Sequence, residues 1–301
     1  MGVRFVCALL ALAGLGVAAC GGSSHARAAA IARPATSGCS RSSSYPVRSA
    51  HINATRRATT STQTRHFDPT AWFPARPGAG CSFPLIVFSP GANSRPVGYT
   101  PLLSHLASQG FVVIGVLPMD QTARGDEAAE RVDDVTYLLD HLHAIAKRLA
   151  PGLPAELDAK RIGVAGHSFG AFVASQEAIS EPRIRAALVM AGPLRPDNAA
   201  STRVPVLAMT GSADTAVPSR LVRSYYDSLP ATIPHGYLQI AGATHGAYGK
   251  NCPARRTCGI VQSYATAFFR RYLDGLHSAG RLLDPRTPRS SRVLLRTVDM
   301  P

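Results

Sequence analysis

Six short apolar runs alternate along the chain with longer segments of helical periodicity, and this alternation constrains the fold more than any other feature. The runs are five to seven residues long and rich in Val, Ile and Leu, as buried strands are: 85–89, 111–116, 161–165, 186–191, 204–210 and 236–240. The helical segments cover roughly 99–109, 126–149, 169–180, 218–229 and 259–276. Apolar strands joined by helices indicate a parallel sheet covered on both faces. We therefore predict one doubly wound α/β domain.

Before the first of these strands, residues around 51–60 and 64–73 alternate between apolar and polar side chains. This alternation predicts an antiparallel hairpin at the edge of the sheet. We place the α/β domain at 51–278 of the 301 residues. The segment 20–50 is rich in Ala, Ser, Gly and Arg and is predicted to be a flexible tether. Residues 279–301 are predicted to form a C-terminal tail, in which a Val-Leu-Leu-Arg segment could pack.

Residues 1–19 have the layout of a secretory signal peptide. Arg4 precedes an apolar run from Phe5 to about Ala19, and this run is shorter than the roughly 20 residues that a bilayer-spanning helix needs. The end of the run, Val-Ala-Ala-Cys, resembles a bacterial lipobox, whose cysteine would become the lipidated first residue of the mature protein. An ordinary cleaved signal with a chance cysteine is the alternative. We therefore expect an exported protein, either a lipoprotein of a bacterial cell envelope anchored in the membrane through Cys20, or a secreted one.

Export changes how the remaining cysteines are interpreted. Besides Cys7 in the signal and Cys20, the chain contains Cys39, Cys81, Cys252 and Cys258. An even number in an oxidising compartment indicates disulfides. Proximity in sequence favours Cys39 with Cys81 and Cys252 with Cys258. A zinc site is the alternative, but the chain lacks both a C-x-x-C pair and a His-rich spacing that would support one.

The formal net charge of +14 derives almost wholly from arginine, because lysine occurs only at positions 147, 160 and 250. Such a surplus can attract nucleic acid or an anionic surface. The arginines are scattered, however, and no basic helix is interleaved with aromatic residues. We therefore interpret them as solvated surface and tails, which could dock on anionic envelope polymers, and expect no nucleic-acid partner. The sequence leaves the oligomeric state open, with a monomer as the expectation.

The segment Gly-His-Ser-Phe-Gly at 166–170 joins a predicted strand to a predicted helix. Small residues at Gly166 and Gly170 let the chain turn sharply enough to present Ser168 Oγ above the sheet edge, as a nucleophile elbow does. Ordinary turn chemistry is the alternative, since Gly and Ser are common in loops. The partners of the serine therefore decide between the two interpretations.

Two further residues follow predicted strands in the order that an α/β-hydrolase triad requires. Asp214 comes after the strand 204–210, and His245 comes after the strand 236–240. Reacting groups of an open parallel sheet gather at the carboxyl ends of its strands. A serine hydroxyl becomes nucleophilic when an imidazole takes its proton and a carboxylate orients that imidazole. We therefore predict Ser168, Asp214 and His245 as the catalytic residues, in the chain order Ser, Asp, His.

Each partner also has an ordinary structural interpretation. Asp214 could form a turn, and His245 could cap a helix or lie on the surface. Asp120, Asp133 and Asp134 compete for the role of the acid, but the last two are predicted to lie on a solvated helix face. Seven other histidines are poorer candidates, because they fall on predicted helices, on early segments or on the wrong side of the elbow: His51, His66, His105, His141, His143, His167 and His235. The ring of His167 is predicted to point away from the serine.

The oxyanion that forms when a serine attacks an ester needs two preorganised donors, usually backbone N–H groups. Phe169 follows the predicted nucleophile at a helix N-terminus, whose dipole favours negative charge. The second donor should come from the loop 89–95, where Gly91 lets the chain bend back. We therefore predict the amides of Ala92 and Phe169 as the oxyanion hole. Without a triad, this loop would be better interpreted as a simple turn.

These motifs together resemble the α/β-hydrolase superfamily, specifically the cutinase-like polyester hydrolases and their platelet-activating-factor acetylhydrolase and dienelactone-hydrolase-like relatives. The resemblance is carried by Gly-His-Ser-Phe-Gly, the Ser-Pro-Gly-Ala loop at 89–92, Thr-Gly-Ser-Ala-Asp-Thr-Ala-Val-Pro at 210–218, Ala-Gly-Ala-Thr-His at 241–245, and the segments 71–75, 102–116 and 224–245. It covers about residues 50–276 and implies a serine carboxylic-ester hydrolase with the triad and the oxyanion donors named above.

Departures from the family pattern affect the expected substrate. Polyester hydrolases carry an aromatic residue after the Ser-Pro-Gly turn and Pro-Trp after a later strand, where this chain has Ala92 and Gly192-Pro193-Leu194. The aromatic clamp on a flat polymer unit is therefore expected to be missing. Ala171 stands where relatives carry a second glycine, and should tighten the packing of its helix. About a dozen residues follow the strand 186–191 before the next strand, too few for a substantial lid, so we expect an open cleft.

The sequence thus predicts an α/β-hydrolase fold, with a mostly parallel, doubly wound sheet, an antiparallel N-terminal edge and no substantial lid. The expected activity is hydrolysis of small-molecule or lipid-like esters through an acyl-enzyme. We expect no cofactor and no metal, because the chain has neither clustered His/Asp ligands nor a Gly-rich phosphate loop. The alternatives are an envelope acyltransferase or a peptidase that uses the same triad, and a catalytically silent binding lipoprotein. The acyl chain length and the alcohol of the substrate stay open.

Overall fold

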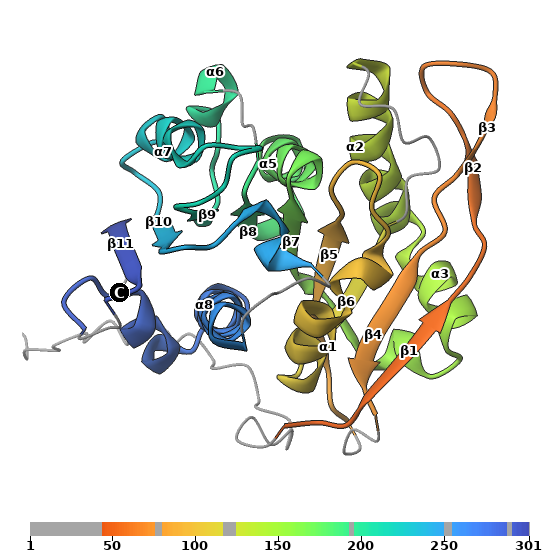
Figure 1. Ribbon diagram of the computed structural model, residues 1–301. Coiled ribbons are helices and arrows are strands. Elements are labelled where there is room, and N and C mark those ends of the chain that lie inside the picture. Colours follow the sequence, from red (N-terminus) through yellow and green to blue (C-terminus); the bar gives the residue numbers. More distant parts are fainter. Residues whose placement is uncertain are drawn as a thin grey trace, which may run out of the picture. The chain divides into compact units, whose positions relative to one another are not determined.

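Nine strands form one sheet in the computed structural model, which describes residues 44–75, 80–116, 125–192, 196–249, 255–287 and 291–300. Their order across the sheet is β1-β4-β6-β5-β7-β8-β9-β10-β11 (Figure 1). The bounds are β1 Val47–His51, β4 Thr70–Pro74, β5 Phe83–Ser89, β6 Val112–Gly115, β7 Leu157–His167, β8 Ile184–Met190, β9 Val206–Gly211, β10 His235–Ile240 and β11 Val293–Val298. The central strands from β6 to β10 run parallel, whereas β1 and β4 at one edge and β11 at the other pair antiparallel.

The six apolar runs predicted as strands are β5 to β10, so this part of the prediction is confirmed. Their buried parts are mostly apolar because each strand sends alternate side chains into two different cores. In β5, Leu85 and Val87 belong to one hydrophobic cluster, and Ile86 and Phe88 belong to the other. Both clusters exclude water, so neither face of the strand has room for polar residues.

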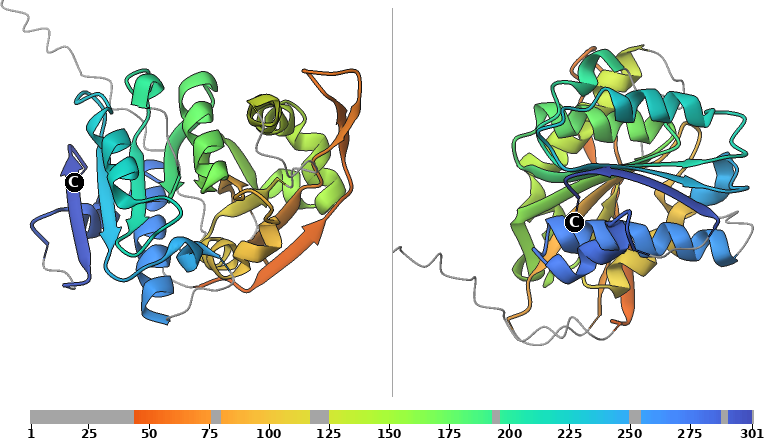
Figure 2. Two further views of the ribbon diagram at one scale, coloured as in Figure 1. Left: turned by 45° about the horizontal axis from the view of Figure 1, so that its top comes forward. Right: turned by 90° about the vertical axis from the view of Figure 1, so that its left-hand side faces the viewer.

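Helices cover both faces of the sheet, as the right-hand view of Figure 2 shows. The first cluster packs the sheet against α2, α3, α5 and α7, and the second packs it against α1, α8 and η3. The bounds are η1 Pro96–Tyr99, α1 Thr100–Ser108, α2 Gly125–Asp140, α3 Leu142–Leu149, α4 Leu153–Glu156, α5 Phe169–Ser180, α6 Pro196–Ala199, α7 Ser219–Asp227, η2 His245–Tyr248, α8 Arg255–Tyr272 and η3 His277–Leu283. The predicted α/β-hydrolase fold is therefore confirmed.

The single helix predicted over 126–149 is wrong, because the segment forms two helices, α2 and α3. His141 separates them with a non-helical backbone, φ −110° and ψ 20°. Its ring stacks on Tyr137 at 4.0 Å between centroids, and its Nδ1 lies 2.9 Å from the Tyr137 carbonyl oxygen. The helical periodicity continues through this break, so the sequence pattern does not reveal it.

The predicted N-terminal hairpin exists, but it is longer and is divided into two parts. Its outer strands, β1 and β4, pair with each other and join the main sheet through β6. Its inner strands, β2 (Thr55–Arg57) and β3 (Thr64–His66), form a separate two-stranded ribbon. Because β1 begins at Val47, the predicted domain boundary at residue 51 is too late.

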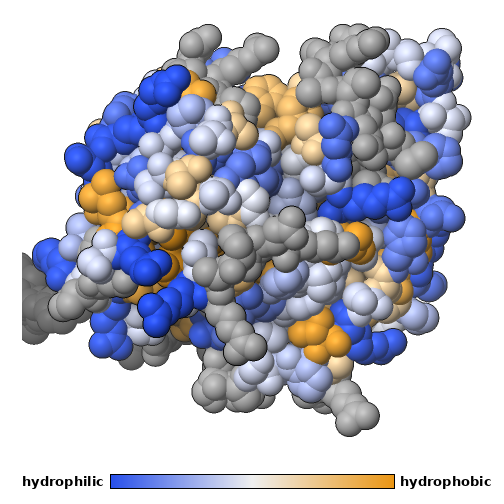
Figure 3. Space-filling view, in the orientation of Figure 1, coloured by the Kyte–Doolittle hydropathy of each residue, from blue (hydrophilic) through white to orange (hydrophobic). Residues whose placement is uncertain are grey.

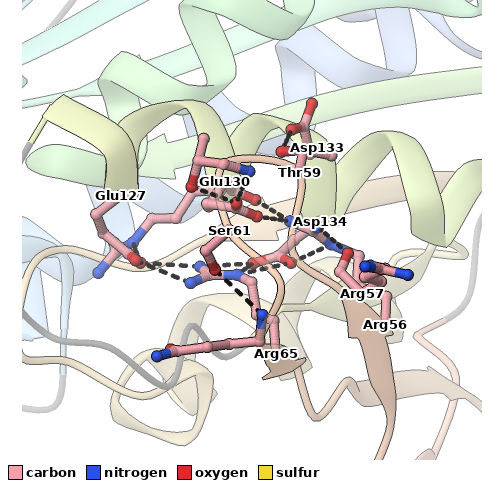
Figure 4. A network of polar contacts seen from close by, with 12 residues as sticks. Arg56, Arg57, Thr59, Ser61, Arg65, Glu127, Glu130, Asp133 and Asp134 are labelled. Atoms are coloured by element: carbon pink, nitrogen blue, oxygen red, sulfur yellow. Dashed lines mark hydrogen bonds and ion pairs between the residues drawn. The ribbon is translucent and has the colours of Figure 1, made fainter.

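The β2–β3 ribbon is attached to α2 by buried charges rather than by apolar contacts (Figure 4). Arg56 on β2 pairs with Glu130 at 2.6 Å and with Asp134 at 2.8 Å, and Arg65 on β3 pairs with Asp134 and Glu127 at 2.8 Å each. The prediction that Asp134 lies on a solvated helix face is therefore wrong, since its side chain is buried. The two arginines that neutralise it lie about 70 residues earlier in the chain, where local sequence gives no indication of the contact.

The C-terminal region does not form the predicted tail from residue 279, because its described residues belong to the fold. Residues 277–283 form η3, and β11 adds an antiparallel strand beside β10. The side chains of Val293, Leu295 and Met300 are buried against the second core cluster. This pairing is non-local, and the surrounding arginines and prolines obscure the short apolar alternation of the strand.

On the face shown in Figure 3, apolar residues lie in separate patches among hydrophilic ones. The large apolar side chains that are exposed in the described residues are Val97, Leu221 and Leu294. Among the helices described, none combines the length and the apolar character that crossing a bilayer requires. The predicted signal peptide, residues 1–19, and residues 20–43 of the predicted tether lie outside the described residues, whereas the end of that tether, residues 47–50, belongs to β1.

Candidate active site

Ser168 lies in a sharp turn between the end of β7 and the start of α5. Its backbone has φ 56° and ψ −120°, a conformation that costs a non-glycine residue free energy and persists only where the surroundings enforce it. Close packing at two glycines shows how the surroundings enforce this conformation. A Cβ added to Gly166 would lie 1.9 Å from the Gly170 carbonyl oxygen, and one added to Gly170 would lie 1.9 Å from the Ser89 carbonyl oxygen. Both positions therefore exclude any larger residue, and the turn is held tightly.

The three predicted catalytic residues lie within hydrogen-bond distance of one another. Ser168 Oγ is 3.0 Å from His245 Nε2, and His245 Nδ1 is 2.9 Å from Asp214 Oδ2. Ser168 is half-buried, the His245 side chain is 28% exposed and the Asp214 side chain is fully buried. The serine and the imidazole are therefore open to solvent on one side, while the carboxylate is enclosed behind them.

The surroundings of Asp214 fix the tautomer of His245. Asp214 Oδ1 accepts hydrogen bonds from the amides of Ala216 at 3.0 Å and Val217 at 2.8 Å, and Oδ2 faces the imidazole. An ionised carboxylate can only accept hydrogen bonds, so His245 Nδ1 carries the proton. In the neutral imidazole, His245 Nε2 is then the unprotonated nitrogen that can accept the hydroxyl proton of Ser168.

The two loops that carry Asp214 and His245 are joined to each other at their bases. The Ala213 amide donates to the Ala243 carbonyl at 3.0 Å, and the Gly242 amide donates to Ser212 Oγ at 2.8 Å. A Cβ added to Gly211, the last residue of β9, would lie 2.1 Å from the Ala243 carbonyl oxygen. The carboxyl ends of β9 and β10 therefore hold the acid and the imidazole in one rigid unit.

The loop after β5 lies directly against the serine. A Cβ added to Gly91 would lie 3.2 Å from Ser168 Cβ, so the neighbouring residue Ala92 is next to the elbow. Asn93 has φ 55° and lies in the turn of this loop. Within the described part of the chain, the hydrogen bonds of this loop and of the first turn of α5 leave the amides of Ala92 and Phe169 without a backbone or side-chain acceptor. Both amides therefore keep a free donor, as the predicted oxyanion hole requires.

Arg131 on α2 contacts both sides of the predicted oxyanion hole, and no sequence signal pointed to it. Its Nη1 donates to the Pro90 carbonyl at 3.3 Å, and its guanidinium carbon lies 4.5 Å from the centre of the Phe169 ring. Its Nε donates to Glu127 Oε1 at 3.0 Å, which connects it to the buried charges beneath the β2–β3 ribbon. The contacts join segments that are distant in sequence, so only the folded chain reveals them.

The ring of His167, predicted to point away from the serine, lies beside the imidazole of the candidate triad. The centroids of the His167 and His245 rings are 4.7 Å apart, and His167 Nε2 is 2.9 Å from the His245 carbonyl oxygen. Burial and the nearby His245 lower the pKa of His167 to about 3. His167 is therefore a neutral, buried part of the site and not a second base.

The predicted lipidation and disulfide positions lie mostly beyond the described residues. Cys20, Cys39 and Cys252 are outside them, as are Pro193 and Leu194. Cys81 and Cys258 are each disulfide-bonded, and the pairing stays a prediction. No cluster of three or more His, Cys, Asp or Glu side chains that could hold a metal ion occurs among the residues described.

Ala171, predicted to tighten the packing of its helix, lies against the end of β8. A Cβ added to Gly192 would lie 2.3 Å from Ala171 Cβ and 2.9 Å from the Ser168 carbonyl oxygen. The alanine methyl therefore occupies space that is open only because residue 192 is glycine. This contact closes the elbow on the side opposite Ser89.

An α/β fold whose elbow serine contacts a histidine that in turn contacts an aspartate is typical of the class of α/β serine hydrolases, and comparisons with known proteins narrow this class to carboxylic-ester hydrolases. The model of the PET hydrolase-like family (PETase) matches residues 29–292, so the chain belongs to that family. The chain is similar to Cutinase 1 of Thermobifida cellulosilytica, with 29% identity over 198 residues, 64% of this chain and 70% of that protein. It is also similar to a cutinase of Thermobifida fusca (29%, covering 64% of this chain and 60% of that protein).

A third relative extends the range of substrates named in this group. The bis(hydroxyethyl) terephthalate hydrolase of Streptomyces coelicolor is 27% identical over 210 residues, 68% of this chain and 62% of that protein. The chain thus spans less than two thirds of the length of this relative and of the Thermobifida fusca cutinase. The class of enzyme follows from the family, whereas the substrate is a matter for proposal.

Proposed function

We propose that this protein is an exported esterase that hydrolyses carboxylic esters through an acyl-enzyme on Ser168. The observation that carries the proposal is the continuous contact from Asp214 through His245 to Ser168, with distances of 2.9 and 3.0 Å. The donor and acceptor roles along this line are unambiguous, since Asp214 can only accept. With Asp214 ionised and the imidazole neutral, this arrangement has the protonation state that the first step of acyl transfer requires.

The first half of the reaction forms the acyl-enzyme. His245 Nε2 takes the hydroxyl proton as Ser168 Oγ attacks the ester carbonyl carbon, and the carbonyl oxygen becomes an oxyanion. The amides of Ala92 and Phe169 donate to that oxyanion, and the buried carboxylate of Asp214 stabilises the imidazolium. The tetrahedral intermediate then collapses, the bond to the alcohol oxygen breaks, and His245 gives its proton to the departing alcohol.

The second half repeats these steps with water. His245 removes a proton from a water molecule, the resulting hydroxide attacks the acyl carbon, and the oxyanion forms again at the same two amides. Collapse releases the carboxylic acid and returns the proton to Ser168 Oγ. Hydrolysis thus needs only that water reaches His245 Nε2, and the partial exposure of this side chain supports such access.

We propose that the substrates are small soluble esters rather than polyester chains. The relatives are named as cutinases and as a bis(hydroxyethyl) terephthalate hydrolase, and the second name describes a small diester. Ala92 supplies only a methyl group at the position where polyester hydrolases carry an aromatic ring. A flat polymer unit would therefore lose a stacking contact on this side, whereas a small ester needs none.

The proposal also includes export, lipidation at Cys20, and disulfides between Cys39 and Cys81 and between Cys252 and Cys258. The disulfide-bonded state of Cys81 and Cys258 supports an oxidising destination. Metabolic labelling with an alkyne-tagged fatty acid should mark the full chain but not its Cys20→Ala variant. Peptide mass spectrometry without reduction should recover both linked pairs. A secreted product without the label would instead indicate an ordinary cleaved signal peptide and no lipid anchor.

Replacing Ser168 with alanine is the central test. The Ser168→Ala variant should lose at least about 10³-fold in kcat on p-nitrophenyl butyrate and all labelling by a fluorophosphonate probe, while its circular dichroism spectrum and Tm stay unchanged. Ser180→Ala, on the exposed end of the same helix, is the matched control and should behave as the unmodified protein. Turnover in Ser168→Ala near that of the unmodified protein would refute the assignment. Appearance of a transacylation product when a hydroxyl acceptor is added would identify an acyltransferase instead.

A further inference from the structure

A chain of hydrogen bonds runs behind Ser168 and connects the oxyanion loop to the imidazole loop. The Gly91 amide donates to Tyr99 Oη at 3.2 Å, and Tyr99 Oη lies 2.8 Å from His167 Nδ1. On the other side of the same ring, His167 Nε2 lies 2.9 Å from the His245 carbonyl oxygen. Three regions that are distant in sequence, around residues 91–99, 167 and 245, thus meet in one line.

The direction of each bond follows from what its ends can do. The His245 carbonyl can only accept, so His167 Nε2 carries the ring proton and donates it. Because burial keeps His167 neutral, its Nδ1 has no proton and accepts a hydrogen bond from the Tyr99 hydroxyl. The Tyr99 oxygen is then free to accept from the Gly91 amide. Each donor has an acceptor, and the three bonds are mutually consistent.

Close packing makes this line rigid. Tyr99 and His167 are 4% and 6% exposed, and their ring centroids are 5.5 Å apart. A Cβ added to Gly91 would lie 3.3 Å from both His167 Nδ1 and Tyr99 Oη. The loop that carries Ala92 is therefore pressed against the Tyr99 and His167 side chains, with no room to move toward them.

We propose that Tyr99 and His167 are positioning residues for the esterase reaction, and this inference rests on the proposed function. Neither side chain contacts the reacting atoms. Tyr99 fixes Gly91, and so places the adjacent Ala92 amide at the oxyanion. His167 holds the His245 backbone, and so sets the distance from the imidazole to Ser168. Together they hold the oxyanion hole and the general base at one fixed spacing.

The alternative is that Tyr99 and His167 serve only the stability of the core, and a neighbouring tyrosine separates the two interpretations. Tyr248 is also fully buried, and its ring centroid lies 5.2 Å from that of His167. Its hydroxyl, however, has no hydrogen-bond partner within the described residues. Tyr248→Phe therefore makes the same chemical change beside the same ring without breaking the line of hydrogen bonds.

The test compares Tyr99→Phe with Tyr248→Phe on p-nitrophenyl butyrate. Loss of a whole oxyanion donor costs about 10²–10³ in kcat, and a displaced donor costs part of that. We expect Tyr99→Phe to lower kcat about tenfold with KM within about twofold. The inhibition constant of an alkylboronic acid, whose tetrahedral adduct occupies the oxyanion hole, should rise by a similar factor. Tyr248→Phe should leave all three values unchanged. Unchanged kinetics in Tyr99→Phe, or equal losses in both variants, would overturn the proposal.

A measurement independent of activity keeps this test separate from that of the proposed function. Imidazole ¹⁵N NMR of the full chain should show His167 protonated at Nε2 and bare at Nδ1 down to about pH 4, and Tyr99→Phe should shift the Nδ1 resonance. A His167 that carries its proton on Nδ1 would refute the hydrogen-bond line whatever the kinetics. If the NMR result holds but the unmodified protein hydrolyses no ester, the proposed function fails while the hydrogen-bond line stands.

Discussion

Glu177 provides a prediction that links a buried charge to the pH dependence of folding. It lies in α5, is 0% exposed, and neither carboxyl oxygen has a hydrogen-bond partner within the described residues. Burial, with a smaller contribution from the charges of Glu181 and Asp133, raises the pKa of Glu177 from 4.5 to about 9. The folded protein therefore holds this carboxyl in its neutral form at neutral pH.

The sign and size of the effect follow from proton linkage. Between pH 4.5 and 9 the unfolded chain has released the Glu177 proton and the folded chain has kept it, so stability falls as pH rises. The slope is about 1.4 kcal/mol per pH unit. At pH 7.5, three units above the unfolded value, Glu177 costs on the order of 4 kcal/mol relative to pH 4.5. Below pH 4.5 the cost is absent.

The assay is urea denaturation of Glu177→Gln and the unmodified protein at pH 5, 6, 7 and 8. The glutamine at position 177 does not titrate. The free energy of unfolding of the variant should therefore gain on that of the unmodified protein, and their difference should rise by roughly 1 kcal/mol or more per pH unit. The glutamine N–H groups add a penalty of about 1–3 kcal/mol if unpaired, but this penalty does not vary with pH. A difference that stays flat between pH 5 and 8 would refute the reasoning, because it would mean that the carboxyl is solvated or ionised in the folded state.

A neighbouring glutamate supplies the control with the opposite sign. Hydrogen bonds from Arg183 lower the pKa of Glu181 although burial of its side chain acts in the opposite direction. Its stabilising contribution is present above the unfolded value of 4.5 and is lost as pH falls through the lower folded value. Glu181→Gln should therefore destabilise the protein at neutral pH, and its effect should shrink in acid, whereas in acid Glu177→Gln keeps only the pH-independent penalty of its glutamine.

Two further predictions concern the site. Asp214→Asn should lower kcat on p-nitrophenyl butyrate by about 10³–10⁴, because a neutral amide permits the wrong tautomer of His245, and the Tm should change little. Arg131→Met keeps an apolar stem over Phe169 but removes the cation and the hydrogen bond to the Pro90 carbonyl. This variant should destabilise the protein by about 2–3 kcal/mol and lower kcat by roughly tenfold. Urea denaturation and steady-state kinetics measure both, and an active, fully stable Arg131→Met variant would contradict the structural role assigned to it.

The parts of the fold that the sequence predicted well are those set by local pattern. The central parts of strands β5 to β10 are buried on both faces, so most of their residues are apolar, and the runs stand out from the helical segments. The spatial position of Ser168, Asp214 and His245 followed from the same pattern, because each directly follows one of these strands. Topology then required their side chains to meet at one edge of the sheet.

The parts that could not be predicted depend on partners that are distant in the chain. Asp134 looked solvated because nothing near it indicates Arg56 and Arg65, and β11 looked like a tail because its pairing partner lies more than fifty residues earlier. His167 looked unrelated to the site because its partners, Tyr99 and His245, are 68 and 78 residues away. Local periodicity contains no information about such contacts, so the same limit applies to each of these errors.

The strained turn at Ser168 shows how distant contacts and local pattern combine at the site. A serine with φ 56° would relax if the chain could move, and three backbone contacts prevent it: Gly166 against the Gly170 carbonyl, Gly170 against the Ser89 carbonyl, and Gly192 against the Ser168 carbonyl. At each position, the absence of a side chain leaves room for a backbone carbonyl oxygen. Any Cβ at these three positions would push the turn toward a relaxed backbone and carry Oγ away from His245, so the glycines that make the turn possible also fix the distance on which proton transfer depends.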